Sequence, residues 1–263
     1  MKTFEFFANE KIKQFLIKNE LKNFQTIWKL DIGWFEDRNV RRGGWSGVSQ
    51  HRVDNGKGLF IKRQENHCYR SWDGFFLPVA TFYREFKNIQ RFVRNDIPTL
   101  ELLYYGQRKE EGGLQAILIT NELDGYSSLD SGAIKEQLDE DFKLRRAAIK
   151  KIAEVVSLMH ESHFQHNCLY EKHVFIKVLQ DGSVDVRLID LEKVKWKPFK
   201  AQAMYRDLGS LFRHSSGWNN RDCLRFFLFY QKEKHLSNKS KKTLNTFIEK
   251  VKQKQIKSNK SDA

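Results

Sequence analysis

The sequence has 263 residues, 40% of them hydrophobic, and a formal net charge of +14 from 47 Lys and Arg against 33 Asp and Glu. This composition excludes a disordered chain, and the length suits one large domain or two smaller ones. Three cysteines, a small and odd number, argue against a disulfide framework and favour a reducing compartment. We therefore expect a cytoplasmic protein with a substantial hydrophobic core.

The apolar stretches of the sequence are short. The longest, 116–119 and 226–230, fall far below the roughly 20 residues that a membrane-spanning helix needs. The amino-terminal segment mixes charged with apolar side chains and shows no secretory signal. These features predict a soluble or peripheral protein.

The positive charge is concentrated near the carboxyl end. Residues 231–263 hold ten Lys against three acidic residues, which gives this segment half of the net charge. Such a tail is attracted to polyanions, for example an anionic membrane surface, although it could equally serve only solubility. No helix-turn-helix, zinc-finger or RNA-binding pattern accompanies it, so we expect no specific nucleic-acid partner.

Residues 1–30 space their apolar side chains at nearly helical intervals, which predicts an amphipathic helix. The next segment changes character, because Gly43, Gly44 and Gly47 precede two apolar runs that predict a β-hairpin over 48–61. A backbone without side chains can approach phosphate oxygens, which amide N–H groups then bind. A plain hairpin turn would use the same glycines.

Lys62 ends the second strand of that hairpin in this interpretation. A helix follows, because four apolar residues recur at i, i+4, i+7 and i+11: Phe82, Phe86, Ile89 and Val93. Glu85 lies close to this buried stripe. Two more strands, 100–106 and 115–123, complete a small antiparallel sheet with one helix. A strand-end Lys is usually just exposed, so Lys62 and Glu85 gain meaning only as a pair.

The sequence after residue 125 is mainly helical. Apolar residues between 144 and 159 predict a long helix that ends near His160, where a His can interact with the terminal carbonyls. A His-led loop and two strands follow in the order 166–173, 174–179 and 184–189. The second strand leads directly into Asp190. Helical pattern resumes near residue 206 and frays into the Lys-rich tail.

The order of these parts resembles that of protein-kinase-like phosphotransferases, in which a Gly-rich loop covers phosphates, a Lys pairs with a helix Glu, and an Asp holds magnesium. Five segments make the resemblance more specific: 39–48, 60–64, 82–89, 188–192 and 205–211. With these segments the sequence resembles the bacterial lipopolysaccharide kinase family (Kdo/WaaP type), especially its InaA branch, from about Trp34 to Tyr230.

The resemblance implies an α+β, protein-kinase-like two-lobe fold, with a small antiparallel-sheet N-lobe that has one helix and a larger, mainly helical C-lobe. The expected divisions are a helical extension, the N-lobe, the C-lobe and a Lys-rich tail, over residues 1–33, 34–124, 125–235 and 236–263. The family also implies ATP and Mg²⁺ as cofactors and an inner-core sugar of lipopolysaccharide, or a related glycolipid, as acceptor. It further implies peripheral contact with the cytoplasmic face of the inner membrane.

The resemblance also assigns roles to single residues. Lys62 would contact the ATP phosphates, with Glu85 as its orienting partner. Asp190 would bind Mg²⁺, which prefers oxygen ligands, although a strand-end Asp can also serve only a turn. His173 would be a second metal ligand. The remaining expected nucleotide-binding residues are Gly43, Gly44, Gly47 and Glu122. Glu192, two positions after Asp190, would aid metal or substrate binding or be merely solvated.

The loop that begins at His166 departs from the phosphotransferase pattern H-x-D-x-x-x-x-N. His166 matches the leading His, Cys168 stands at the position of the base Asp, and His173 at that of the metal-binding Asn. A general base typically contributes about 10²–10⁴-fold, whereas positioning and charge stabilisation dominate phosphoryl transfer. Two interpretations therefore stay open: a kinase in which Cys168 is either the base or an inert thiol, and a pseudokinase scaffold that binds nucleotide. Asp207 would brace this loop or cap a helix.

Overall fold

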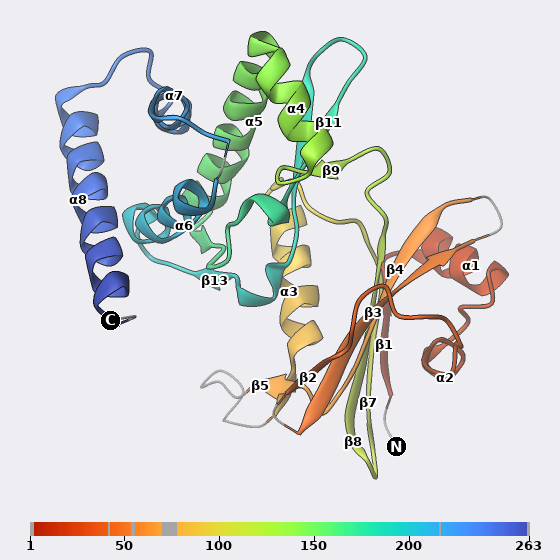
Figure 1. The fold of residues 1–263 in the computed structure, drawn as a ribbon. Coiled ribbons are helices and arrows are strands. Elements are labelled where there is room, and N and C mark those ends of the chain that lie inside the picture. The colour runs from red at the N-terminus through yellow and green to blue at the C-terminus, as the bar shows by residue number, and fades with distance from the viewer. Residues whose placement is uncertain (1–2, 42, 54–55, 70–77, 216, 262–263) are drawn as a thin grey trace. The chain divides into compact units, whose positions relative to one another are not determined.

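The computed structural model describes residues 3–41, 43–53, 56–69, 78–215 and 217–261 (Figure 1). The chain folds as two compact units. The first, which we call the sheet unit, comprises Met1–Arg94 and Thr99–Asp124. The second, the helical unit, comprises Asn95–Pro98 and Gly125–Ala263. Each unit has its own set of buried hydrophobic side chains.

The sheet unit is built on a six-stranded antiparallel sheet with the strand order β1-β7-β8-β4-β3-β2. Its strands are β1 (Phe4–Phe7), β2 (Asn39–Arg41), β3 (Gly44–Arg52), β4 (Gly58–Glu65), β7 (Leu102–Glu110) and β8 (Gly113–Asn121). Two short strands, β5 (Cys68–Tyr69) and β6 (Val79–Ala80), pair with each other ahead of helix α3 (Thr81–Arg94). Both predicted hairpins are present, because β3 pairs with β4 and β7 with β8.

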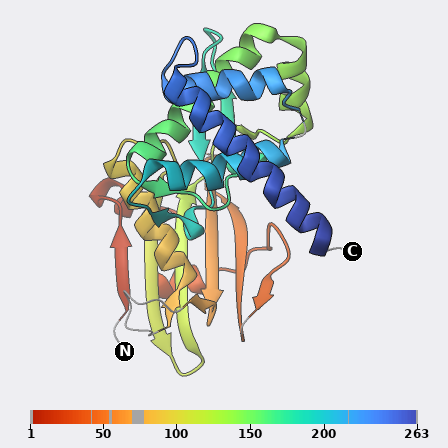
Figure 2. The ribbon, with the colours of Figure 1, turned by 90° about the vertical axis from the view of Figure 1, so that its left-hand side faces the viewer.

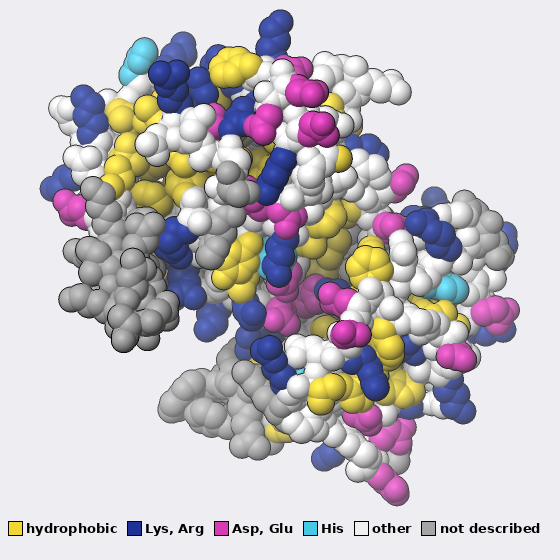
Figure 3. All heavy atoms as spheres, viewed as in Figure 1, with side chains coloured by type: hydrophobic (Ala, Val, Ile, Leu, Met, Phe, Trp, Pro, Cys, Tyr) yellow, Lys and Arg dark blue, Asp and Glu magenta, His cyan; other side chains and the backbone are white. Residues whose placement is uncertain are grey.

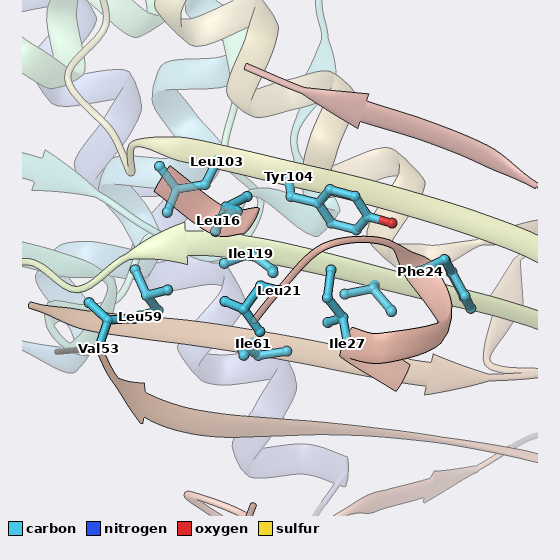
Figure 4. Close-up of a cluster of buried hydrophobic side chains, with 11 residues drawn as sticks. Leu16, Leu21, Phe24, Ile27, Val53, Leu59, Ile61, Leu103, Tyr104 and Ile119 are labelled. Atoms are coloured by element: carbon cyan, nitrogen blue, oxygen red, sulfur yellow. The ribbon is translucent and has the colours of Figure 1, made fainter. Parts of the chain in front are cut away.

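Helices cover both faces of this sheet. On one face, α1 (Glu10–Lys18) and α2 (Phe24–Trp28) pack against β4, β7 and β8 around a buried apolar cluster (Figure 4). Burying a side chain of this kind contributes about 1.5–3 kcal/mol. On the other face, Phe86 of α3 stacks on Tyr105, with ring centroids 4.5 Å apart. Because side chains alternate along a strand, Ile61 belongs to the first face and Lys62 to the face of α3.

The single amphipathic helix predicted over residues 1–30 is wrong. Residues Phe4–Phe7 instead form β1, which pairs with β7, and two separate short helices follow. The helices begin at polar caps that the periodicity conceals: Asn9 accepts a hydrogen bond from the backbone of Ile12, and Asn23 forms a capping box with Thr26. Apolar spacing alone does not distinguish one helix from two that pack on the same sheet.

Two details of the sheet unit also differ from the prediction. Val93 is 60% exposed, whereas Phe92 is fully buried, so the buried stripe of α3 shifts by one residue at its last turn. Lys62 does not end its strand, because β4 continues to Glu65. Lys62 is therefore held in register between Val48 and Leu118 of the neighbouring strands. A mid-strand position fixes its backbone more firmly than a strand end would.

The helical unit contains α4 (Gly132–Glu140), α5 (Phe142–Glu161), α6 (Lys200–His214), α7 (Asn220–Gln231) and α8 (Asn238–Ser261). Its short strands and 3-10 turns are β9 (Ser127–Ser128), β10 (Phe164–Gln165), β11 (Val174–Val178), β12 (Val184–Leu188), β13 (Lys195–Trp196), η2 (Glu171–His173) and η3 (Leu191–Lys193). The predicted long helix is α5, which packs against α7 through buried residues such as Ile152 and Phe226. The predicted strand pair before Asp190 is β11 with β12.

The Lys-rich segment does not fray as predicted, because α8 runs through it (Figures 1 and 2). Phe247, only 5% exposed, anchors α8 by stacking on Tyr205 and meeting Phe212 of α6 edge-on. Lys is itself a good helix former, so the basic composition of this segment is compatible with a helix. No helix in the described part of the chain is both long and apolar enough to span a bilayer.

Candidate functional site

Lys62 and Glu85 form an ion pair on the α3 face of the sheet. Their Nζ and Oε1 atoms lie 2.7 Å apart, and the side chains are 19% and 2% exposed. Glu85 is buried because it shares a face of α3 with Phe82 and Phe86. A buried carboxylate is costly unless it is paired, so the ammonium and the carboxylate hold each other in place. The predicted pair is thus formed, and it presents a cation at a fixed position.

The three glycines of the Gly-rich segment occupy different environments. Gly43, in the β2–β3 turn, has φ +74° and open space where a side chain would project. A Cβ on Gly44 would lie 2.3–2.5 Å from the backbone of residues 65–67, and one on Gly47 would lie 2.6 Å from the ring of Trp34. Close packing therefore explains why Gly44 and Gly47 lack side chains. Among the three, only Gly43 has open space of the kind that a phosphate would need.

The carboxylate of Glu122 is engaged by β3. It accepts a hydrogen bond from Gln50 Nε2 at 2.8 Å and pairs with Arg52 Nη1 at 3.4 Å. The backbone N–H of Glu122 also donates to the carbonyl of Gly58. These contacts fix the end of the β3–β4 hairpin. A role of Glu122 toward a nucleotide stays a prediction.

Asp207 braces the His-led loop. It lies in the middle of α6, fully buried, and accepts hydrogen bonds from the backbone N–H groups of His166 at 2.6 Å and Asn167 at 2.9 Å. The alternative that Asp207 caps the helix is wrong, because the N-cap of α6 is Phe199. A carboxylate that binds two successive amide N–H groups fixes the loop backbone strongly.

His160 does not interact with terminal helix carbonyls as predicted. Its Nε2 lies 3.1 Å from Asp207 Oδ2 and its Nδ1 2.9 Å from the hydroxyl of Tyr230. Because Asp207 lies on α6 and Tyr230 on α7, His160 connects α5 with both of these helices next to the loop that Asp207 holds. Sequence reasoning missed this network, because Tyr230 lies 70 residues from His160 and no local pattern joins them.

His166 connects the loop to the end of β12. Its Nε2 lies 3.0 Å from the carbonyl oxygen of Ile189, which can only accept, so Nε2 carries the proton. Burial lowers the pKa of the fully buried imidazole, although the carboxylate of Asp207 opposes this effect. His166 is therefore neutral near pH 7. It fastens the loop to the residue that precedes Asp190.

Asp190 follows β12 in a left-handed backbone conformation, with φ +59° and ψ +58°. Asp adopts this conformation more readily than most residues other than Gly, and six further non-Gly residues of the described chain also have a positive φ. The conformation brings Asp190 Oδ2 to 3.3 Å from Nε2 of His173. The structure thus brings the two predicted metal ligands together within the helical unit.

The hydrogen bonding of His173 bears on whether a cation fits here. Its Nδ1 lies 2.7 Å from the carbonyl oxygen of Cys168, so Nδ1 must be the donor. In neutral His173 the lone pair of Nε2 then points toward the Asp190 carboxylate, and two acceptors face each other. Either a proton on Nε2, which would make the contact an ion pair, or a bound cation removes that repulsion. Among the described residues no three possible metal ligands gather, so a divalent metal here would have only Asp190 and His173 as protein ligands and would take the others from water or phosphate oxygens.

The environment of Cys168 argues against a thiolate base. The side chain is buried, and burial raises the pKa of the thiol, an effect that the nearby ammonium of Lys193 only partly offsets. Cys168 is therefore protonated near neutral pH, as expected of an inert packed thiol. Glu192 pairs with the adjacent Lys193 at 3.6 Å, which leaves its role toward metal or substrate a prediction.

Arg63 is a further residue that the sequence analysis missed. It lies on the sheet face opposite Lys62, almost fully buried, and its Nη1 donates to the carbonyls of Trp28 and Leu30. The ring of Trp34 covers its guanidinium, 4.6 Å from the ring centroid. Arg63 thereby holds the chain before β2 against the sheet. Because side chains alternate along β4, Arg63 faces the opposite side of the sheet from its neighbour Lys62, and this alternation was the only sequence signal for its role.

The profile of the lipopolysaccharide kinase (Kdo/WaaP) family matches residues 25–230, which is most of the chain and includes every candidate site residue. The chain belongs to the lipopolysaccharide kinase (Kdo/WaaP) family. Protein InaA of Escherichia coli (strain K12) is 30% identical over 195 residues, covering 73% of this chain and 87% of that protein. The resemblance stated from the sequence is confirmed.

A solved structure supports the fold. WaaP, in a complex with acyl carrier protein, matches with a TM-score of 0.67 and 18% identity, over 96% of this chain and 99% of that one. The α+β, protein-kinase-like fold is therefore confirmed. In this family fold, the Lys62–Glu85 pair is carried by the sheet unit, and the loop with Cys168, His173 and Asp190 by the helical unit.

Proposed function

We propose that this chain is an ATP-dependent kinase that phosphorylates a sugar hydroxyl of the lipopolysaccharide inner core or of a related glycoconjugate. Membership of the lipopolysaccharide kinase family supports the reaction class. The observation that carries the proposal is the buried Lys62–Glu85 ion pair, since a cation oriented by a helix Glu is the device with which kinases bind nucleotide phosphates.

In this proposal the sheet unit binds the nucleotide. Lys62 presents its ammonium to the phosphates, and Glu85 keeps it from turning away. Gly43 offers an open turn for close approach, while Gly44 and Gly47 shape the hairpin that carries it. Glu122 would contribute indirectly, by fixing the far end of the hairpin through Gln50 and Arg52.

The helical unit would hold the metal. Asp190 and His173 would bind Mg²⁺, which supplies charge neutralisation of the phosphates. Asp207 and His166 keep the two ligands at a fixed spacing by fastening the loop and the end of β12. Because Cys168 is protonated, the acceptor hydroxyl has no strong base there. We expect transfer to be slower by about 10²–10⁴-fold than with an Asp at this position.

The proposal is tested by transfer of labelled phosphate from ATP to purified core oligosaccharide. Asp190→Asn should abolish transfer while its circular dichroism stays that of the wild type. Asp181→Asn is the matched control, because Asp181 lies in the exposed β11–β12 turn and its side chain accepts hydrogen bonds from Ser183, its one partner among the described residues. Undiminished transfer by Asp190→Asn would overturn the proposal.

A pseudokinase is the second candidate, and the protonated Cys168 thiol is the observation that favours it. Such a protein would bind ATP and Mg²⁺ through the same residues without transferring phosphate. Titration calorimetry with ATP, run beside the transfer assay, separates the two. Binding without transfer by the wild type, with transfer by Cys168→Asp, would establish the pseudokinase.

The proposed partners are the glycolipid acceptor and, for the protein as a whole, the cytoplasmic face of the inner membrane. Because the WaaP structure contains acyl carrier protein, that protein is a further candidate partner for this chain. Co-purification of the two proteins tests this last candidate directly.

A further inference from the structure

The segment that follows the Asp190 turn exposes two large aromatic side chains between lysines. Trp196 is 59% and Phe199 65% exposed. They belong to the run Lys193-Val194-Lys195-Trp196-Lys197-Pro198-Phe199, which we call the basic aromatic loop. Figure 3 shows that hydrophobic and basic side chains both reach the face of the molecule seen in that view. Other large hydrophobic side chains of the chain are exposed to a similar degree, for example Phe35 and Phe142, so it is the lysines flanking these two rings that set the segment apart.

The basic aromatic loop is held on a fixed frame. Within it, β13 pairs with β10, so that Trp196 lies opposite Phe164. The backbone N–H of Lys197 donates to the carbonyl of His163 at 2.7 Å, and Nδ1 of His163 donates back to the carbonyl of Lys197 at 3.1 Å. Val194, 3% exposed, anchors the start of the loop in the core. The aromatic side chains are thus presented outward by an ordered backbone.

Two lysines of the loop have no acidic partner among the described residues, namely Lys195 and Lys197. Lys200, just beyond the loop, differs, since its ammonium pairs with Glu161 at 3.0 Å and lies 4.6 Å from the centroid of the Tyr230 ring. Lys193 likewise pairs with Glu192. The charge that is available for an external partner therefore lies on both sides of Trp196.

We propose that the basic aromatic loop docks on the surface of an anionic lipid bilayer. Trp196 and Phe199 would enter the interfacial region, and Lys195 and Lys197 would contact headgroup phosphates. Segments that bind at the membrane–water interface typically combine lysines with large aromatic side chains, and Trp is enriched at the depth of the lipid headgroups. A bilayer also accepts protruding rings without a matching pocket, which a protein partner would have to supply. This inference rests on the membrane contact included in the proposed function and deepens it by naming the segment that makes the contact. Docking does not depend on phosphate transfer, so the two can fail separately.

The test is sedimentation of the full chain with vesicles made of equal parts phosphatidylcholine and phosphatidylglycerol. Lys195→Gln with Lys197→Gln should weaken binding about 30-fold, since each lysine near an anionic surface contributes about five-fold. The matched charge control is Lys239→Gln with Lys241→Gln, two exposed lysines of α8. Retention of at least one-third of the wild-type affinity by this control would assign docking to the loop and not to the Lys-rich helix.

A second pair of variants tests the aromatic side chains. Trp196→Ser with Phe199→Ser should abolish sedimentation, whereas Phe142→Ser should leave it unchanged. Phe142 is a matched control because it is 57% exposed and begins α5, about 30 Å from the end of that helix near His163. Circular dichroism of each variant excludes unfolding.

Insertion itself has a spectroscopic signature. Vesicles with brominated acyl chains should quench the tryptophan fluorescence of the wild type, and Trp196→Phe should lose most of that quenching while it still sediments. Sedimentation that survives both loop variants would overturn the inference. So would failure of the wild type to bind these vesicles, whether or not the loop then binds an acidic protein.

Discussion

Replacing Glu85 with Gln should destabilise the sheet unit by about 3 kcal/mol. The substitution leaves the Lys62 ammonium without its carboxylate in a site where only 19% of the Lys side chain reaches solvent. Breaking a buried ion pair typically costs about 3–5 kcal/mol, and the remaining exposure of Lys62 places this case at the lower end. The measurement is the free energy of unfolding of the full chain in urea.

Removing both charges should cost less stability than removing one of them. Lys62→Met with Glu85→Leu should recover most of the lost stability, because apolar side chains of similar size can replace a buried pair. The same double variant should fail to bind ATP, since the fold would persist without the cation. This double variant should therefore keep most of its stability and lose nucleotide binding.

The control is the exposed pair Lys150–Glu154 on α5, whose charged atoms lie 3.8 Å apart and whose side chains are 57% and 46% exposed. Glu154→Gln should cost no more than about 0.5 kcal/mol. If Glu85→Gln costs as little as Glu154→Gln, or if the effects at positions 62 and 85 simply add, the pair is not coupled as the structure implies.

Three further predictions concern the backbone, the loop brace and acid stability. Gly44→Ala should prevent or severely distort the β3–β4 pairing, because the new Cβ would lie 2.3 Å from a backbone atom. Gly43→Ala should cost only about 1–2 kcal/mol of stability, which reflects its left-handed φ. Thermal unfolding of both variants checks this, and equal losses of stability would contradict it. Asp207→Asn should replace an acceptor oxygen by an NH₂ group that faces buried donors, which should lower the free energy of unfolding by about 2–3 kcal/mol. The backbone amides of the His-led loop should then exchange hydrogen faster. Unchanged exchange would refute the role of Asp207 in holding the loop. Burial by itself would raise the pKa of Asp222, but hydrogen bonds from Arg145 outweigh it and leave the pKa below its ordinary value. Its stabilisation is present above the unfolded pKa of about 3.9 and is lost as pH falls through the lower folded value, so Asp222→Asn should flatten the stability curve below about pH 4, and an unaltered curve would disprove this.

Local patterns predicted the elements that carry their own signal. The stripe of Phe82, Phe86 and Ile89 placed α3 and put Glu85 at its buried edge, and alternation placed the strands on either side. The last turn was misassigned, because Val93 and Phe92 fit an apolar helix almost equally well and tertiary packing decides which is buried. Spacing cannot make that distinction.

Contacts between distant residues leave no local pattern in the sequence. The brace from Asp207 to the loop at His166 spans about 40 residues and was predicted only through the family resemblance, because its partners are backbone N–H groups, which leave no mark on residue type. The glycines show a related limit. A glycine demanded by the ring of Trp34, as at Gly47, is indistinguishable in sequence from one that makes room for a phosphate.

Motif order predicted which residues form the candidate site, and local chemistry then revised their roles. Cys168 could have been a thiolate beside Lys193, but burial keeps the thiol protonated. His173 was assigned to metal only from its position in the loop, and its bond to the Cys168 carbonyl adds the reason, since it turns Nε2 toward Asp190.

The central claim is that this chain transfers phosphate from ATP to a sugar hydroxyl. The most direct measurement is the phosphorus NMR spectrum of core oligosaccharide after incubation with ATP, Mg²⁺ and the wild-type protein. A new phosphomonoester signal that is absent with Asp190→Asn is the predicted result. Tight binding of ATP without any phosphomonoester would contradict the claim and leave the pseudokinase.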